Sequence, residues 1–222
     1  YKLEVGHPPG APFFMLLARF LMVFSTPETA AIFANALSAL SSSFTILFLF
    51  WSITHLAKKF TVGEAKSISG AQTWAVLGSG AVGALAYTFS DSFWFSAVEG
   101  EVYALSSLFT ALVFWAILKW ESVADEPGNL RWILLIAYLM GLSIGVHLLN
   151  LLAIPAIALV FYFKRYEFSW KGILLTAVAA VALLGFIQEG LIKGVVNLAG
   201  KFELFFVNDL GMGFNTGVMV YA

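Results

Sequence analysis

Three carboxylates without a nearby cation make the segment Ser90–Tyr103 (SDSFWFSAVEGEVY) the first place to look for chemistry. Asp91, Glu99 and Glu101 lie there between two long apolar runs, and the segment contains no Lys or Arg. Carboxylates are costly to place in a membrane protein, so they are candidates for a functional site. They could bind a cation, a metal ion that also binds a phosphate, or an acceptor hydroxyl. The alternative is that they stabilise the N-terminus of the next helix, for which one carboxylate would suffice.

Tyr103 joins these candidates because of its spacing. If the residues from Glu99 onward are helical, Glu99 and Tyr103 are four residues apart on one face, while Glu101 points elsewhere. This interpretation makes Tyr103 a candidate for substrate binding beside Glu99.

Two histidines are further candidates, and each has a structural alternative. His7 heads the sequence His-Pro-Pro-Gly, whose prolines favour an extended, rigid turn. His147 and Asn150 lie three residues apart between two apolar runs. Imidazole and amide groups in these positions could take part in a binding site. Alternatively, His7 belongs to a loop entering a helix, and the other two satisfy a break between two helices.

The composition places these residues in a membrane protein. Hydrophobic residues make up 60% of the 222-residue chain, only 11% are charged, and the mean hydropathy is +0.89. A soluble domain is nearer half apolar and about a quarter charged. The chain has no cysteine and a net charge of −1. Disulfides and thiolate metal sites are therefore excluded, and nothing indicates nucleic acid as a partner.

The apolar runs predict an all-α, polytopic helical bundle. A span needs about 20 apolar residues. Six runs qualify: 26–56, with Thr26 as its cap, 70–89, 102–118, 132–147, 149–163 and 172–192. The run 11–24 is shorter and contains Arg19, so we expect an interfacial or re-entrant helix. One transmembrane domain then has an outside loop and this helix in 1–29, six spans in 30–192, and an outside loop in 193–222.

The basic residues orient this bundle. Of the 12 Lys and Arg residues, eight fall in alternate loops: Lys58, Lys59, Lys66, Lys119, Arg131, Lys164, Arg165 and Lys171. Positive charge favours the cytoplasmic side, so the acidic segment, His7 and His147 are expected on the opposite side. The third histidine, His55, lies beside Lys58 at a span end, where interfacial solvation explains it.

The stretch 78–83 (GSGAVG) matches a dinucleotide-binding fingerprint literally. That fingerprint requires a preceding strand and a soluble βαβ unit. Here the glycines lie inside a predicted span, where small residues let two helices approach closely. The stretch therefore predicts helix packing.

Four longer segments carry a family resemblance: GHPPGAPFFMLLARF (6–20), NALSALSSSFTILFLF (35–50), FSDSFWFSAVEGEVYALSSLF (89–109) and GLSIGVHLLNLLAIPA (141–156). They resemble a bacterial family of multi-span proteins that is related to the protein O-mannosyltransferases and belongs to the GT-C glycosyltransferase superfamily. Members of that family are larger. Their first outside loop carries an acidic motif, expected to supply the catalytic base, just before the segment that begins here at Tyr1. The resemblance therefore implies that this chain is an internal piece of a longer protein.

The resemblance also implies an activity. A sugar would move from a polyprenyl-phosphate carrier to a Ser or Thr hydroxyl of a secreted or envelope protein, at the periplasmic face of a bacterial cytoplasmic membrane. Direct attack would invert the anomeric centre. Glu99 and Glu101 correspond to the second outside acidic motif and would position the donor phosphate through water or a divalent cation that one of them binds. The remaining candidates for contact with the donor or acceptor are His7, Arg19, Asp91, Tyr103, His147 and Asn150.

Two other classes of function fit part of the pattern. A transporter or flippase of a lipid-linked or polar solute also uses intramembrane acids and a helix break, but it should bury charge near mid-span. Here the acids are expected at one face. A non-catalytic membrane subunit of an envelope complex is the third possibility.

Overall fold

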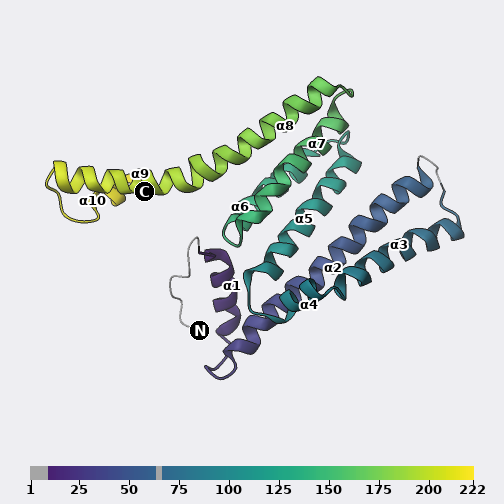
Figure 1. The fold of residues 1–222 in the computed structure, drawn as a ribbon, viewed down its shortest axis with the longest axis horizontal. Helices are drawn as coiled ribbons and strands as arrows, with labels where there is room; N and C mark the ends of the chain where they lie inside the picture. The colour runs from purple at the N-terminus through teal and green to yellow at the C-terminus, as the bar shows by residue number, and fades with distance from the viewer. Residues whose placement is uncertain (1–9, 64–66) are drawn as a thin grey trace. The chain divides into compact units, whose positions relative to one another are not determined.

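Helices form all the regular secondary structure in residues 10–63 and 67–222, the part of the chain that the computed structural model describes (Figure 1). The chain divides into two compact units, Tyr1–Ala153 and Ile154–Ala222. The first unit contains α1 (Pro12–Met22), α2 (Ala30–Val62), α3 (Gly70–Thr88), α4 (Asp91–Val98), α5 (Val102–Val123), α6 (Leu130–Ile144) and η1 (Leu148–Leu152). The second contains α7 (Ala153–Arg165), α8 (Trp170–Gly185), η2 (Phe186–Lys193), α9 (Gly194–Leu204), η3 (Phe205–Asp209) and α10 (Thr216–Tyr221).

The long helix α2 is the centre of the first unit and packs against α1, α3, α4 and α5. Its buried polar residues are all small hydroxyl residues, which let neighbouring helices approach closely: Ser38, Ser41, Ser42, Thr45 and Ser52. The Thr45 and Ser52 hydroxyls donate to carbonyls one turn earlier, each over 2.8 Å. The Ser38 and Ser42 hydroxyls have no hydrogen-bond partner within the described residues.

Glycines bring α3 onto α2, as the sequence predicted for the stretch 78–83. A Cβ at Gly80 would lie 2.5 Å from Thr54 Cγ2, and one at Gly83 would lie 2.6 Å from Ile53 Cδ1. A Cβ at Gly78 would meet nothing within 4 Å. The packing interpretation is therefore confirmed for Gly80 and Gly83 and is wrong for Gly78.

Helix α1 is the short helix expected at 11–24, and it packs into the first unit. The Phe13 N–H donates to the Gly145 carbonyl over 2.8 Å. Phe14 and Ala18 are buried in a cluster with Leu37 and other apolar side chains. With 11 residues, α1 extends only about 16 Å, which is too short to cross a bilayer.

The count of membrane spans differs from the expected six. Four helical segments of the described chain are long and apolar enough to cross a membrane: Ala30–Val62, Val102–Val123, Leu148–Arg165 and Trp170–Asp209. Helix α6 has only 15 residues. Helix α3 has 19, but its glycines together with Gln72 and Thr73 make it less apolar.

The cap predicted at Thr26 is wrong, because α2 begins at Ala30 with Thr29 before it. The Thr26 N–H donates to Thr29 Oγ1 over 3.0 Å, so residues 26–29 form a turn. A hydrogen bond with the Thr26 side chain holds the pKa of the Glu28 carboxyl below its usual range.

In the second unit the loop expected from residue 193 onward is largely helical. Helix α8 continues through two π-helical stretches and α9 to Asp209, because apolar residues persist along the whole segment. Helix α10 then folds back on α9. The Glu203 carboxylate accepts hydrogen bonds from the N–H groups of Asn215 (2.5 Å) and Val218 (3.0 Å), which stabilises the start of α10.

Candidate functional site

The acidic segment is not a single loop, because α4 occupies most of it. Asp91 lies exposed in the first turn of α4, and Glu99 follows its last residue with extended backbone (φ −104°, ψ 142°). The eight residues of α4 separate Asp91 from Glu99 by about 12 Å along the helix axis. Since α5 begins only at Val102, the predicted helical face shared by Glu99 and Tyr103 does not form.

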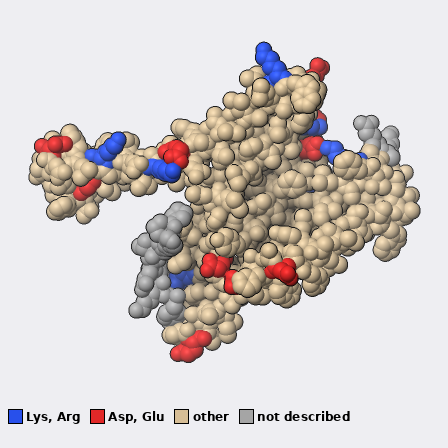
Figure 2. Space-filling model, in the orientation of Figure 1, with Lys and Arg blue, Asp and Glu red and all other residues tan. Residues whose placement is uncertain are grey.

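Glu99 and Glu101 lie together in a tight connection between α4 and α5. The Glu101 N–H donates to the Glu99 carbonyl over 2.9 Å. A Cβ at Gly100 would lie 3.1 Å from Asn35 Oδ1, so the glycine brings this connection close to α2. Figure 2 shows acidic side chains gathered over α4 and the start of α5.

The helix-cap alternative is not supported at Glu101. This residue occupies the N-cap position of α5, yet its carboxylate makes no capping hydrogen bond to the helix. Glu101 is exposed and Glu99 is partly exposed. The Glu101 carboxylate is therefore available to another group.

Tyr103 and His147 contact each other, although they are 44 positions apart in the sequence. Their ring centroids lie 5.6 Å apart, with an angle of 48° between the planes. His147 precedes η1, and its Nδ1 accepts a hydrogen bond from the Leu149 N–H over 3.1 Å. Nε2 is thus the ring nitrogen left to meet a ligand. The predicted helix break at His147 is confirmed, since α6 ends at Ile144 and His147 has extended backbone.

Asn150 is a buried structural contact between η1 and α5. Asn150 is only 3% exposed. Its Oδ1 accepts hydrogen bonds from the hydroxyls of Thr110 and Ser106, the latter over 3.3 Å. These bonds support the alternative in which Asn150 satisfies the helix break. Its Nδ2 has no partner within the described residues.

The last two candidates are Arg19 and His7. Arg19 is in the last turn of α1 and partly buried, a position where a cation interacts favourably with the helix dipole. His7 lies outside the residues that the structure describes.

An apolar cavity of about 260 Å³ lies between α2, the end of α3 and α4. Its lining is mostly apolar, with Phe93 and Trp94 of α4 and three hydroxyl residues, Ser42, Ser43 and Thr88. Asp91 borders a separate pocket of about 460 Å³ with aromatic neighbours. Among the described residues no group of three His, Cys, Asp or Glu side chains could hold a metal ion.

Sequence reasoning missed Asn35, Ser106 and Thr110. A signal for the last two was present, because Tyr103, Ser106 and Thr110 follow the i, i+3, i+7 spacing of one helix face. That face of α5 meets His147 and Asn150. Asn35 is a polar residue inside an apolar run, but nothing in its spacing indicates the contact with Gly100.

Comparison with known proteins relates the whole of this region to one family. Residues 1–170 match the model of the protein O-mannosyl-transferase TMEM260 N-terminal domain. A curated relative, the protein O-mannosyl-transferase TMEM260 of Mus musculus, is 25% identical over 144 residues. That match covers 65% of this chain and 18% of the mouse protein, so the chain spans less than a fifth of that relative. No solved structure matches the chain. Because the family match covers well over half of its residues, the chain belongs to the TMEM260 N-terminal domain family.

Proposed function

We propose that this protein is a membrane glycosyltransferase of the GT-C type that moves a sugar from a polyprenyl-phosphate donor to a Ser or Thr hydroxyl of a protein. The family match carries the proposal, because the family description names a protein O-mannosyl-transferase. The matched residues include both Glu99–Tyr103 and His147–Asn150.

In the proposed reaction the acceptor oxygen forms a bond to the anomeric carbon, and the bond from that carbon to the phosphate oxygen breaks. The polyprenyl phosphate leaves with the bonding electrons, and the acceptor proton passes to a carboxylate base. Such direct attack inverts the anomeric centre. Glu99 and Glu101 are assigned a positioning role, as the resemblance implies, and the base is assigned to an acidic motif of a preceding segment.

The side chains and the cavity around the α4–α5 connection support this assignment. The Glu101 carboxylate makes no capping bond to α5. His147 keeps Nε2 for a phosphate oxygen or a sugar hydroxyl, with the exposed Tyr103 beside it. The cavity of about 260 Å³ beside α4 offers apolar walls for part of the isoprenyl chain. Arg19 and His7 are further proposed contacts for the phosphate.

A divalent cation at this site would need ligand oxygens from the donor phosphate in addition to the protein's carboxylates. Magnesium is commonly bound by one or two carboxylates together with substrate phosphates and waters. Glu99 and Glu101 could supply those carboxylates, and no third His or acidic side chain joins them among the described residues. When bound, such an ion would neutralise charge on the leaving phosphate.

The proposed setting is a bacterial cytoplasmic membrane with the acidic connection facing the periplasm. The four long apolar segments support a multi-pass membrane protein. We propose that α3 and α6 also cross the membrane, packed among the longer helices. Within the first unit, α3 packs on α2 and α6 packs on α5.

The test is sugar transfer by the protein at its full natural length in nanodiscs, with polyprenyl-phosphate mannose and a Ser/Thr peptide. Glu99→Gln and Glu101→Gln keep the side-chain shape and remove the charge. Each should lower the rate about a hundredfold, the usual effect of losing one group that stabilises the transition state. Glu126→Gln, in the turn before α6, is the matched control and should keep full activity. Full activity in both variants, or movement of the donor across the bilayer without sugar transfer, would contradict the proposal.

A further inference from the structure

Another pocket lies at the other end of α2 from the acidic connection. Its volume is about 410 Å³, and it lies between α2 and α5, with the buried Val76 of α3 on one wall. Helix α2 contributes Trp51, His55 and Lys58. Helix α5 contributes Trp115 and Lys119, four residues apart on one face.

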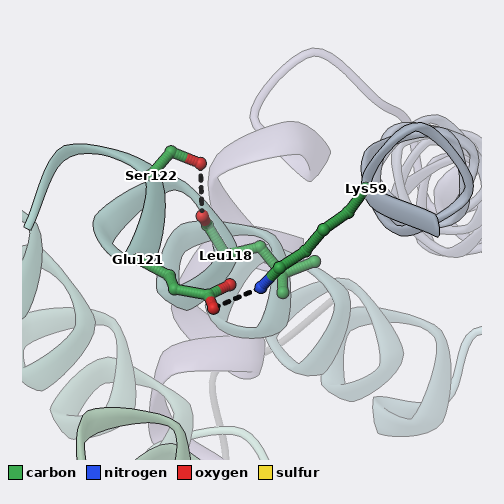
Figure 3. A network of polar contacts seen from close by, with 4 residues as sticks. All are labelled: Lys59, Leu118, Glu121 and Ser122. Atoms are coloured by element: carbon green, nitrogen blue, oxygen red, sulfur yellow. Dashed lines mark hydrogen bonds and ion pairs between the residues drawn. The ribbon is translucent and has the colours of Figure 1, made fainter. Parts of the chain in front are cut away.

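The pocket carries uncompensated positive charge. No carboxylate pairs with Lys58 or Lys119 within the described part of the chain. Glu121 of α5 is already bound: Lys59 reaches across from α2 and forms an ion pair with it at 2.5 Å (Figure 3). Two lysines therefore remain to attract an anion, and the Lys59–Glu121 pair holds α2 and α5 at a fixed separation beside them.

The walls around these lysines are aromatic. The Lys119 ammonium lies 5.7 Å from the centroid of the Trp115 ring, which holds it at the pocket. Trp115 contacts Trp51, with ring centroids 5.8 Å apart. Indoles combine a large apolar surface with one N–H donor, a combination suited to the boundary between lipid headgroups and acyl chains.

The position along the helices matches that boundary. Lys58 follows Asn35 by 23 residues of one continuous helix, so the pocket lies about 35 Å from the acidic connection. That length is close to the thickness of a bilayer. The pocket is thus at the opposite membrane face, the one where most Lys and Arg residues gather.

We infer that this pocket binds the phosphate headgroup of an anionic lipid, with Lys58 and Lys119 at the phosphate oxygens and the two tryptophans against the glycerol and upper acyl chains. Basic pockets between membrane helices on the positively charged side bind such headgroups. His55 lines the same pocket and makes no hydrogen bond within the described residues, so it can add a third donor. This binding does not depend on the proposed sugar transfer.

The test is a lipid titration of the purified protein in detergent, followed by native mass spectrometry. The probe is palmitoyl-oleoyl phosphatidylglycerol, with the phosphatidylcholine of the same acyl chains for comparison. Lys58→Gln and Lys119→Gln should each raise the apparent Kd for phosphatidylglycerol about fivefold, and the double variant should raise it roughly 25-fold. Lys171→Gln, an exposed lysine of the second unit, removes the same charge and should have no effect.

Two further measurements distinguish lipid binding from a structural role of the lysines and from binding of free phosphate. A charge-preserving double variant, Lys58→Arg with Lys119→Arg, should restore binding, which a purely structural role of the lysines would not require. Inorganic phosphate at millimolar concentration should not displace the lipid. Unchanged affinity in the Lys58→Gln/Lys119→Gln protein would overturn the inference, and so would displacement of the lipid by free phosphate alone.

Discussion

The imidazole of His147 lies against the phenol ring of Tyr103, with ring centroids 5.6 Å apart. Its Nδ1 is occupied by the Leu149 N–H, so the side chain has both a structural hydrogen bond and a ring face toward α5. These two roles can be separated by substitution.

His147→Asn should keep the protein folded and weaken donor use. Asparagine can still accept the hydrogen bond from the start of η1 but has no imidazole. His147→Ala should in addition lose about 1 kcal/mol of stability, since the capping acceptor disappears. A thermal melt combined with a donor titration distinguishes the two variants. If the asparagine variant binds the donor as tightly as the wild type, His147 acts only as a cap.

Thr110→Val should destabilise the first unit without changing its shape. The Thr110 hydroxyl donates to the buried Asn150 Oδ1, and valine has the same size without the donor. An interhelical hydrogen bond in a membrane protein contributes about 1 kcal/mol. Thr73→Val is the control, because the Thr73 hydroxyl bonds only to the Ser69 carbonyl of its own helix start. Equal melting temperatures for the two variants would show that the Thr110 hydroxyl does not stabilise Asn150.

Gly80→Leu should lower the melting temperature, because its side chain would collide with Thr54 and Phe50 on α2. Overpacking of this kind typically costs about 1–3 kcal/mol. Gly78→Leu is the matched control on the same helix, where a side chain meets open space. A greater loss of stability at Gly78 than at Gly80 would contradict the packing of α3 on α2.

Single cysteines should report opposite sides of the membrane at the two ends of α5. These 222 residues contain no cysteine, so each introduced thiol is the only one among them. Helix α5 has 22 residues and extends about 33 Å, enough to cross the apolar core. Ser92→Cys and Glu126→Cys place exposed thiols beyond its two ends. A membrane-impermeant maleimide applied to sealed cells should label only one of them. Labelling of both from outside would show that α5 does not span.

The class of protein and several local features follow from the amino-acid sequence alone. Long apolar runs with few charges indicate membrane helices, since such a surface cannot be covered in water, and the described residues are helical as expected. The break at His147 and the close approach at Gly80 and Gly83 were also predictable, because both depend on the chemistry of a few adjacent residues.

The contacts between residues on different helices depend instead on how the folded chain packs. Hydropathy does not distinguish a polar loop from a short helix such as α4, and it does not give the length of α6, which has 15 residues. The sequence makes Asn150 a candidate ligand, but in the fold its side-chain oxygen accepts hydrogen bonds from Ser106 and Thr110. Lys59 and Glu121 are 62 positions apart in the sequence and form an ion pair between α2 and α5. Partners of this kind depend on how helices pack side by side, and the spacing of residues within one helix does not encode that arrangement.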